Sequence, residues 1–451
     1  MNKFLIIGVC TVVVAAALVA STEKSTTSRP LATATTVEDT TSAPAQSADT
    51  FVDALGVDTH FGYDDTIYRY LSRPAPSGNT VVSVLKTLGV RRIRDGGMDQ
   101  RPSLCPIYRT VIANGANFDA LTNPTTDTTA LRAIVACLGS GLSALEAPNE
   151  RDTSGDKNWA QADLAEMRVL IANRGTTFPA SVNLIGPSAT SEAGYAALAA
   201  IDDPTAKAGI DFANTHIYFP GREPETKGWG RTDPFGTYGA VTTTRNWAIS
   251  NGYPPKPWVS TETGYRDDPG ETGYVTPALK TKYLLRDLLT QWQANAQRIY
   301  IYELADEHGS WGLLDSSLRP KPAYTAIKNL ITILSDPGPP LGPGAFRYTV
   351  RANPDVQHLL LHKRDGSFWI WLWQTDPGWD PRADTPIIVP STTATLTFEN
   401  APTKLTKYAF TPEDGSVTVT DFQHASTFIT TVTDTPELIQ IGKIKKPIIL
   451  P

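Results

Sequence analysis

Two glutamates stand four residues apart in the segment "LEAPNERD", residues 145–152. In an extended strand, side chains alternate between the two faces, so Glu146 and Glu150 would point to the same side. A third glutamate, Glu262, stands in the β-branched run "STETGY". Carboxyl groups that converge on one point can divide a reaction between them. The protonated one donates a proton while the ionised one attacks as a nucleophile.

The elements that must hold these residues alternate between β-branched runs and helical patterns from residue 55 to about 334. Eight runs have the pattern of strands: 56–61, 90–96, 117–122, 143–150, 183–190, 211–219, 257–265 and 298–306. Apolar residues at helical spacing fill the stretches between them, for example 158–173 and 276–295. Eight β/α units in about 280 residues predict an α/β protein with a (β/α)8 TIM barrel.

In such a barrel, catalytic residues lie at the carboxyl ends of the strands. The fourth run ends with Asn149 and Glu150, and Glu262 lies near the end of the seventh. Strands four and seven are on opposite walls, so the two carboxyl groups are expected to face each other across the mouth. Cleavage of a glycosidic bond requires this arrangement, with Glu150 as acid/base and Glu262 as nucleophile.

The chain resembles the clan A glycoside hydrolases, which carry an Asn-Glu acid/base on strand four and a glutamate nucleophile on strand seven. "EAPNE", residues 146–150, resembles the E-x-x-N-E strand of family 39 and related families, in which the first glutamate is structural. Residues 311–330 look like the eighth strand-to-helix segment of these enzymes. The resemblance implies a retaining hydrolase of β-glycosidic bonds that needs no cofactor.

The resemblance also implies residues that bind the substrate or support the nucleophile. Arg94 matches an arginine beside the nucleophile, and His216 and Tyr218 match a pair on strand six whose tyrosine donates a hydrogen bond to the nucleophile. The full set of candidate binding residues is Asn149, Arg94, His216, Tyr218, His60, Glu303 and Trp311. Structural interpretations remain open beside these. Glu150 would then be a carboxylate of the rim, Glu262 a helix cap, and Arg94 an ion-pair partner of Asp95 or Glu146.

Two positions depart from these families. Arg151 follows Glu150 at a position where proline is common, which alters the wall beside the leaving group. Strand eight usually supplies a tryptophan as the floor under the sugar, whereas this chain offers Tyr302, Glu303 or the later Trp311. The resemblance therefore does not define the pocket for the glycone, the sugar that is transferred to the enzyme.

Three functions are consistent with these residues and with the resemblance. They are hydrolysis of a poly- or oligosaccharide, transglycosylation by the same residues, and carbohydrate binding at the cell surface without catalysis. The presence of both carboxylates disfavours the third. No G-x-S-x-G or H-E-x-x-H segment supports an esterase or a metalloprotease. The loop at 219–240 carries Trp229, Phe235 and Tyr238, which would either stack on sugars in a groove or form a mobile surface loop.

The composition indicates a globular protein and excludes some partners. A formal net charge of -6 disfavours nucleic acid, which would require a basic surface. The six histidines are scattered, so we expect no structural zinc site and no other metal. Cys105 and Cys137 either form a disulfide between consecutive helices or remain two buried thiols. The sequence does not indicate an oligomeric state.

The chain outside the barrel divides into three parts. Residues 1–20 have the pattern of a secretory signal, or of an uncleaved membrane anchor, and predict a secreted or surface-anchored protein. Residues 21–50, rich in Ser, Thr and Pro, predict a flexible, disordered linker. The barrel is expected over 51–335, and a Pro- and Gly-rich boundary at 335–344 leads to a β-sandwich domain over 340–451.

That last domain alternates short β runs with "RDG" and "EDG" turns, which predicts antiparallel strands. In "FWIWLWQ", Trp369, Trp371 and Trp373 share one face by alternation. This face either stacks on sugars or packs within the sandwich or against the barrel. Because the linker is short, we expect the domain to support the barrel rather than move as a tethered binding module.

Overall fold

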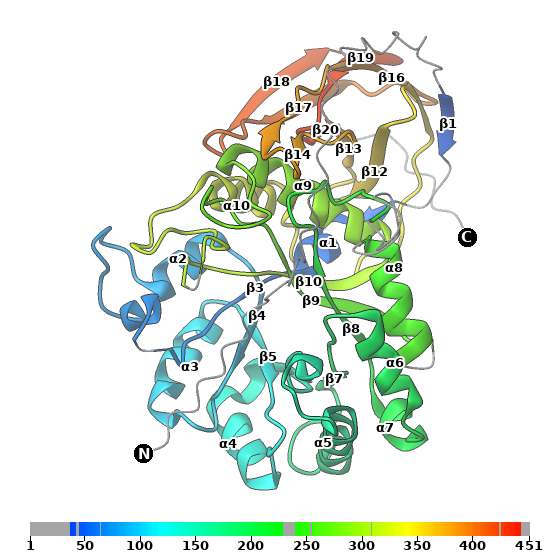
Figure 1. Cartoon of the computed structure of the whole chain (residues 1–451). Coiled ribbons are helices and arrows are strands. Elements are labelled where there is room, and N and C mark those ends of the chain that lie inside the picture. Colours follow the sequence, from blue (N-terminus) through cyan, green and yellow to red (C-terminus); the bar gives the residue numbers. More distant parts are fainter. Residues whose placement is uncertain are drawn as a thin grey trace, which may run out of the picture.

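The computed structural model describes residues 37–41, 45–63, 65–228, 240–252, 255–307, 309–423 and 425–442. The expected signal or anchor at 1–20 and the loop aromatics Trp229, Phe235 and Tyr238 lie outside these residues. Figure 1 shows a sheet wrapped by helices in the lower part and a β domain above it. In the part of the chain that the structure describes, no helix is both long and apolar enough to cross a membrane.

Eight parallel strands form one sheet in the order β7-β6-β5-β4-β3-β10-β9-β8. Their bounds are β3 Leu55–Asp58, β4 Arg92–Gly96, β5 Asn117–Leu121, β6 Leu142–Glu146, β7 Asn183–Ile185, β8 Ala213–Tyr218, β9 Trp258–Gly264 and β10 Ala296–Ile301. A parallel bridge from Ile185 in β7 to Phe212, just before β8, closes the ring. The predicted (β/α)8 barrel is confirmed.

Helices cover the outside of the barrel. They are α1 Ala48–Ala54, α2 Val81–Leu88, α3 Cys105–Ala113, α4 Thr128–Leu138, α5 Trp159–Asn173, α6 Glu192–Ala200, α7 Pro204–Gly209, α8 Val241–Asn246, α9 Pro277–Gln293 and α10 Pro322–Leu334. Short helical turns are Ile67–Tyr70, Pro102–Leu104, Gly139–Gly141 and Arg151–Thr153, and a π-helical turn spans Trp247–Gly252. The local sequence determines where several of these helices begin. For example, the Thr276 side chain accepts a hydrogen bond from the Leu279 backbone N–H, and Pro277 occupies the first helical position of α9.

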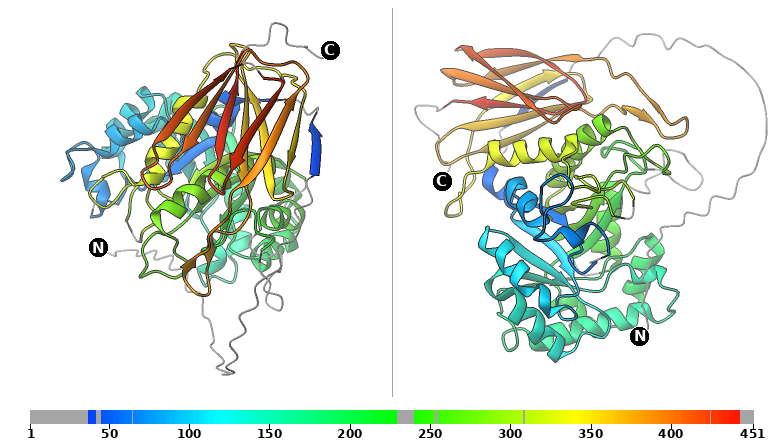
Figure 2. Two further views of the ribbon diagram at one scale, coloured as in Figure 1. Left: turned by 90° about the horizontal axis from the view of Figure 1, so that it is seen from above. Right: turned by 90° about the vertical axis from the view of Figure 1, so that its left-hand side faces the viewer.

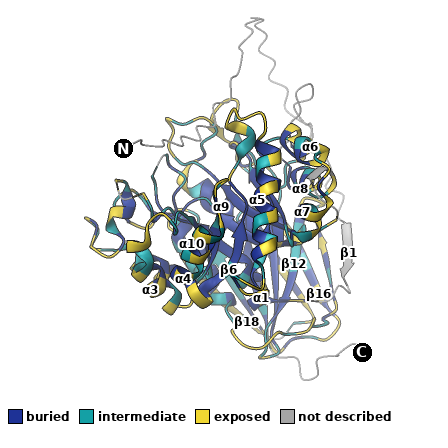
Figure 3. Cartoon of the chain, turned by 90° about the horizontal axis from the view of Figure 1, so that it is seen from below, coloured by how far each residue is buried: buried dark blue, intermediate teal, exposed yellow. Residues whose placement is uncertain are grey.

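The core lies between the strands and the helices, where Figure 3 shows buried strands inside a shell of helices with exposed outer faces. Inside the barrel, by contrast, several buried side chains are polar or charged, including Arg94, Glu146, Asn214 and Thr261. Burying a charge is costly unless it is paired and hydrogen-bonded. The precise polar arrangement inside the barrel is therefore kept at a cost in the stability of the fold.

The β domain consists mainly of two sheets, β1-β11-β16-β19 and β18-β17-β20-β13-β12-β2, with a two-stranded ribbon of β14 and β15. Its later strands are β11 Tyr348–Ala352, β12 Val356–His362, β13 Phe368–Gln374, β14 Trp379–Asp380, β15 Thr385–Pro386, β16 Thr392–Phe398, β17 Lys404–Phe410, β18 Val417–Gln423, β19 Thr427–Val432 and β20 Glu437–Ile441. Apart from the parallel β2–β12 pair, the strands of these sheets pair antiparallel, as predicted.

The linker prediction for residues 21–50 is wrong from residue 37 onward, among the residues described. β1 Val37–Thr41 pairs antiparallel with β11, and β2 Gln46–Ser47 pairs with β12. The edges of the two sheets offer unpaired backbone groups, which an extended Thr- and Val-containing segment can satisfy. The Ser47 side chain then caps α1 by accepting a hydrogen bond from the Thr50 backbone N–H. The β domain is thus built from both ends of the chain.

The tryptophan face of β13 packs against the barrel, so the sugar-platform interpretation is wrong. Trp369, Trp371 and Trp373 are buried and belong to the same apolar cluster as the barrel helices, whereas Ile370 and Leu372 face the sandwich core. The right-hand view of Figure 2 shows the β domain stacked directly on the helical layer. The alternation of side chains along the strand therefore predicted correctly that the three tryptophans share one face.

Polar contacts made by α9 reinforce this contact between the domains. The Arg286 guanidinium in α9 pairs with Glu225, at 2.5 Å, and donates to the backbone carbonyl of Thr375. Lys282, also in α9, lies 2.9 Å from Asp434 of the β domain. Because these groups are wholly or largely buried, their alignment requires that the two domains keep one relative position.

A disulfide joins Cys105, the first residue of α3, to Cys137 near the end of α4. Of the two alternatives that the sequence left open, the structure has the bonded one. The two cysteines are 32 residues apart, and closing a loop of this length stabilises a fold by roughly 3 to 4 kcal/mol in the chain-entropy model.

Candidate active site

The fourth barrel strand is shorter than predicted. β6 ends at Glu146, four residues before Glu150, because Pro148 has no N–H with which to continue the ladder. Glu150 then adopts a left-handed backbone conformation, with φ 43° and ψ 44°, and opens the helical turn Arg151–Thr153. Strand alternation therefore places Glu146 inside the barrel, but a turn, rather than alternation, places Glu150.

This turn brings Glu150 close to Glu262 on β9. A carboxylate oxygen of each residue lies within 4.8 Å of the other. The His216 ring stands between them, with its Nδ1 atom 2.7 Å from Oε1 of Glu150 and 3.5 Å from Oε2 of Glu262. Two carboxyl groups about 5 Å apart can act on opposite sides of a single bond without room for a water between them.

The surroundings of Glu262 favour its ionised form. Nη1 of Arg94 donates to Oε1 at 2.9 Å, and the Tyr218 hydroxyl donates to Oε2 at 2.7 Å. Burial by itself would raise the pKa of Glu262, but the positive charges of His216 and Arg94 and these hydrogen bonds hold it below its usual value. An ionised carboxylate aimed at the mouth of the barrel is a competent nucleophile.

Glu146 holds Arg94 in place from below. Its two carboxylate oxygens accept hydrogen bonds from Nε and Nη2 of Arg94, at 2.8 and 2.9 Å. Asn214 donates to the same carboxylate at 3.0 Å, and Nη2 of Arg94 also donates to Oδ1 of Asn149 at 2.6 Å. A planar guanidinium held at this many points has little freedom. Its remaining nitrogen therefore has a fixed direction, toward Glu262.

The hydrogen bonds around His216 define which ring nitrogen carries a proton. Asn214 uses its amide N–H₂ toward Glu146, so its Oδ1 accepts from the Thr261 hydroxyl, at 2.8 Å. The Thr261 oxygen then accepts from Nε2 of His216, at 3.0 Å. Nδ1 is left to exchange a proton with Glu150. Burial would lower the pKa of His216, but Glu262 and Glu150 raise it above its usual value.

Aromatic side chains form a wall beside Glu262. The Trp311 ring lies 4.9 Å from that of Tyr218 and 6.0 Å from that of Tyr302, centroid to centroid. Arg266 stacks over the Trp311 ring, with its Cζ atom 4.7 Å from the ring centroid. A side chain at Gly264 would collide with the carbonyl oxygen of Tyr302, so the glycine permits β9 and the end of β10 to approach. Such a wall suits contact with the apolar face of a sugar ring.

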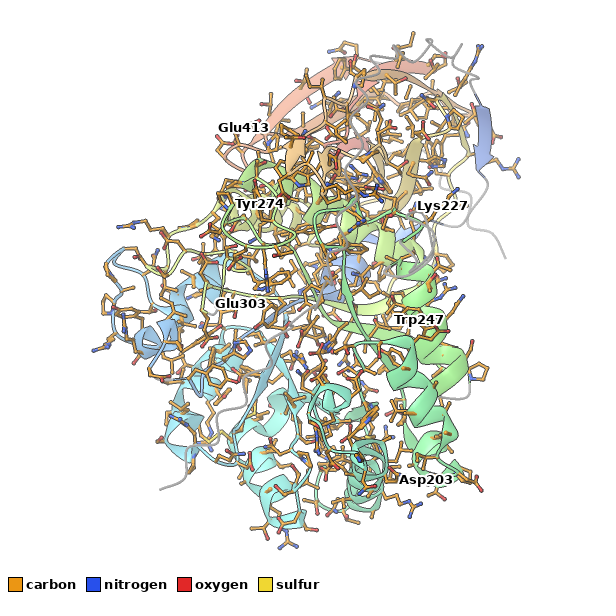
Figure 4. All side chains as sticks on the ribbon, in the orientation of Figure 1. Asp203, Lys227, Trp247, Tyr274, Glu303 and Glu413 are labelled. Atoms are coloured by element: carbon orange, nitrogen blue, oxygen red, sulfur yellow. A yellow bond between two sulfur atoms is a disulfide. The ribbon has the colours of Figure 1, made fainter. Side chains whose placement is uncertain are left out.

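His60 and Glu303 lie together on the other side of this wall, with an additional acid. Nδ1 of His60 is 2.6 Å from Oε2 of Glu307 and 3.3 Å from Oε2 of Glu303. Figure 4 labels Glu303 within the barrel region. Among the described residues, the donor sets that can hold a metal ion are His60, Glu303 and Glu307, and separately Glu150, His216 and Glu262.

The structure gathers all the sequence-predicted candidates at the mouth or just inside it, in two linked groups. Sequence reasoning missed three members: Asp58, Thr261 and Glu307. Asp58 is the last residue of β3, so the same rule that selected the ends of the other strands would have found it. Its carboxylate is buried 3.6 Å from Nη1 of Arg94, and neither oxygen forms a hydrogen bond with any described residue. No comparable pattern in the sequence would have identified Thr261 or Glu307.

No family model matches this sequence, and no curated protein matches it either. Solved structures do share its fold. A family 39 glycoside hydrolase from Bacteroides cellulosilyticus WH2 has a TM-score of 0.57 and 14% identity, covering 87% of this chain and 82% of its own. A GH30 endoxylanase from Clostridium papyrosolvens C71 has a TM-score of 0.52 and 15% identity, covering 89% and 98%.

A third structure is the GH51 α-L-arabinofuranosidase from Thermotoga petrophila RKU-1, with a TM-score of 0.54 and 12% identity over 89% of this chain and 98% of that one. At such identities the likeness establishes the fold, and it extends through the barrel and the β domain together. The chain therefore has the fold of the clan A glycoside hydrolases, from the parallel barrel to the antiparallel domain that packs on it.

Proposed function

We propose that the protein is a retaining glycoside hydrolase in which Glu262 is the nucleophile and Glu150 the acid/base. The observation that carries this proposal is the pair itself. The two carboxylates bring one oxygen each to within 4.8 Å at the mouth of the barrel, and one of them is held ionised by Arg94 and Tyr218. An inverting pair would need a separation of about 6.5 to 9.5 Å to admit a water.

In the proposed first step, Glu150 gives its proton to the leaving oxygen while a Glu262 oxygen forms a bond to the anomeric carbon. The second step reverses these roles. Glu150 takes a proton from water, the resulting hydroxide attacks the anomeric carbon, and Glu262 departs as a carboxylate. Arg94 and Tyr218 share the returning negative charge, and His216 exchanges a proton with Glu150 across their 2.7 Å contact.

The proposed substrate is an oligo- or polysaccharide whose sugar ring stacks on the wall of Trp311 and Tyr302. The names of the similar structures suggest where to search: xylans, and glycosides of α-L-arabinofuranose. We also propose that the protein is exported, on the strength of residues 1–20. N-terminal sequencing of the protein from its own cells tests this, and a mature chain that retains residue 1 in the cytoplasm would refute it.

Azide rescue tests the assignment of the two carboxylates. A panel of aryl glycosides and polysaccharides first identifies a substrate for the native enzyme. In Glu150→Ala, azide enters beside the missing acid/base and traps the glycosyl-enzyme, which gives a glycosyl azide of retained configuration. In Glu262→Ala, azide replaces the nucleophile and gives the inverted product. Glu413→Ala, an exposed site in the β domain, is the matched control and should keep native activity.

Each possible result has a definite meaning. Exchange of the two stereochemical outcomes would reverse the roles of Glu150 and Glu262. Full activity in both variants, on a substrate that the native enzyme cleaves, would exclude this carboxylate pair. Nuclear magnetic resonance of the first product formed by the native enzyme checks retention directly, and an inverted product would refute the double displacement.

A further inference from the structure

We propose that His60, Glu303 and Glu307 bind one divalent transition-metal ion, such as zinc or manganese, beside the aromatic wall. This departs from the expectation that the sequence contains no metal site. One nitrogen and two carboxylate oxygens converge there, all within 4.8 Å of one another. Nδ1 of His60 is the central atom of the group, 2.6 Å from Glu307 and 3.3 Å from Glu303.

A second observation points independently to a ligand. Glu303 is completely buried, yet neither of its carboxylate oxygens forms a hydrogen bond with any residue that the structure describes. Buried carboxylates are normally hydrogen-bonded, paired or bound to a metal. The single contact of Glu303 with His60, at 3.3 Å, leaves the second carboxylate oxygen without a hydrogen-bond partner among the described residues.

Further negative charge gathers around the same point. Asp58, two residues before His60, is 1% exposed and has no hydrogen bond to either carboxylate oxygen among the described residues. Its nearest cation, Arg94, approaches it with Nη1, at 3.6 Å, but the same nitrogen donates to Glu262, and the other two nitrogens donate to Glu146 and Asn149. A dication at the His60 cluster would reduce the repulsion among these buried acids.

The spacing and the ligand types indicate the class of ion. Nitrogen and oxygen ligands lie about 2.0 to 2.2 Å from zinc, so two ligands of one ion are roughly 3 to 3.5 Å apart. The 3.3 Å contact with Glu303 already fits this, and the contact with Glu307 must widen by about 0.5 Å when the metal displaces the proton on Nδ1. Calcium and magnesium prefer oxygen ligands alone, whereas an imidazole with carboxylates suits zinc or manganese.

The position of the site suggests its use. The His60 ring lies 5.8 Å from the ring of Tyr302, which belongs to the wall beside Glu262, and 5.0 Å from the partly exposed ring of Tyr63. Three protein ligands leave at least one coordination position for water or for a hydroxyl group of a bound sugar. The proposal concerns binding only and does not depend on the proposed hydrolysis.

The test measures metal binding to the full-length protein after treatment with a chelator and dialysis. Isothermal titration with ZnCl₂, MnCl₂ and CaCl₂ should give one equivalent of zinc or manganese and weaker binding of calcium. His60→Gln and Glu307→Gln should each lower the affinity for the ion that the native protein binds by at least tenfold. Glu413→Gln, which Figure 4 shows far from Glu303, should bind as the native protein does. Circular dichroism of the metal-free variants checks that they fold.

A fourth variant separates this site from the catalytic pair. Glu150→Gln changes the second donor set, that of Glu150, His216 and Glu262, and should leave the stoichiometry and affinity unchanged. If Glu150→Gln abolishes binding while Glu307→Gln retains it, the ion belongs to the carboxylate pair and the proposal is overturned. A native protein that binds neither zinc nor manganese also overturns it, whatever its activity on glycosides.

Discussion

Nδ1 of His216 lies 2.7 Å from Oε1 of Glu150, a distance across which the two residues can share a proton. The other ring nitrogen is occupied by Thr261, at 3.0 Å, which prevents the ring from turning away. A shared proton belongs to the pair rather than to either group. Glu150 can therefore receive the proton as negative charge develops on the leaving oxygen, without waiting for solvent.

Removing this partner should impair acid catalysis most, although it also removes a positive charge that lowers the pKa of Glu262. We expect His216→Ala to lower kcat/KM by about 10²- to 10³-fold on substrates with poor leaving groups, because Glu150 loses its proton partner. Aryl glycosides with acidic phenols, whose oxygen hardly needs a proton, should lose much less. Plotting the logarithm of kcat/KM against the pKa of the leaving phenol checks this. A slope equal to that of the native enzyme would contradict the prediction.

The hydrogen bond from Tyr218 should set the acid side of the pH profile. Because the pKa of Glu262 is held below its usual value, activity should persist at pH values at which an ordinary glutamate is already protonated. As pH falls through this lowered pKa, the nucleophile is protonated and activity is lost. Tyr218→Phe removes one stabilising hydrogen bond, raises the pKa of Glu262 and shifts the acid limb of kcat/KM to higher pH.

The size of that shift is expected to be about one pH unit, since a hydrogen bond to a charged group is worth roughly 1.5 to 3 kcal/mol and the remaining partners compensate in part. Tyr274→Phe, whose ring packs against Trp379 instead, is the control with an unchanged profile. An acid limb that moves to lower pH in Tyr218→Phe would show that the tyrosine does not stabilise the ionised nucleophile.

Much of the fold followed from local patterns in the sequence. Strand and helix alternation, the turn residues and the two faces of β13 follow from periodicities that every β/α unit or sandwich strand must obey. The position of Glu262 followed from the rule that barrel strands present their ends at one mouth, whereas Arg94, His216 and Tyr218 were implied by the resemblance to clan A glycoside hydrolases. Each of these residues lies on a strand, where backbone geometry fixes the direction of the side chain.

Residues that lie beyond a strand were harder to predict. Glu150 was identified, but as the end of a strand, because alternation alone cannot anticipate a left-handed turn after Pro148. The convergence of Glu307 with His60 depends on a loop after β10, whose path comes from tertiary contacts. The pairing of β1 with β11 joins segments more than 300 residues apart. No composition rule could distinguish that edge strand from a flexible linker.

Glu146 should contribute stability more than chemistry. Its removal as Glu146→Gln leaves the buried guanidinium of Arg94 with one fewer counter-charge, and breaking a buried pair from one side costs about 3 to 5 kcal/mol. Chemical denaturation should show this loss. Arg319→Gln, in an exposed pair with Asp315, should cost about 1 kcal/mol or less and serves as the control. Equal losses in the two variants would contradict the structural role of Glu146.

The final prediction concerns the unity of the two domains. β1 and β2, which precede the barrel, pair with β11 and β12 of the β domain, so both ends of the chain close around the barrel. Deleting residues 340–451 removes the partners of both strands and uncovers the barrel surface beneath the β13 tryptophans. The truncated protein should be insoluble, or should unfold at a much lower temperature than the full chain.

A point variant tests the same contact without deletion. Trp371 is completely buried between the domains, and Trp371→Ala should cost about 3 to 5 kcal/mol, while Ile429→Ala, on an exposed face of the same domain, should cost little. If the domain supports the barrel, calorimetry of Trp371→Ala should show barrel and β domain unfolding together at a lower temperature. A separate low-temperature transition of the β domain, with the barrel still melting at its native temperature and still active, would instead describe an independent module that merely rests on the barrel.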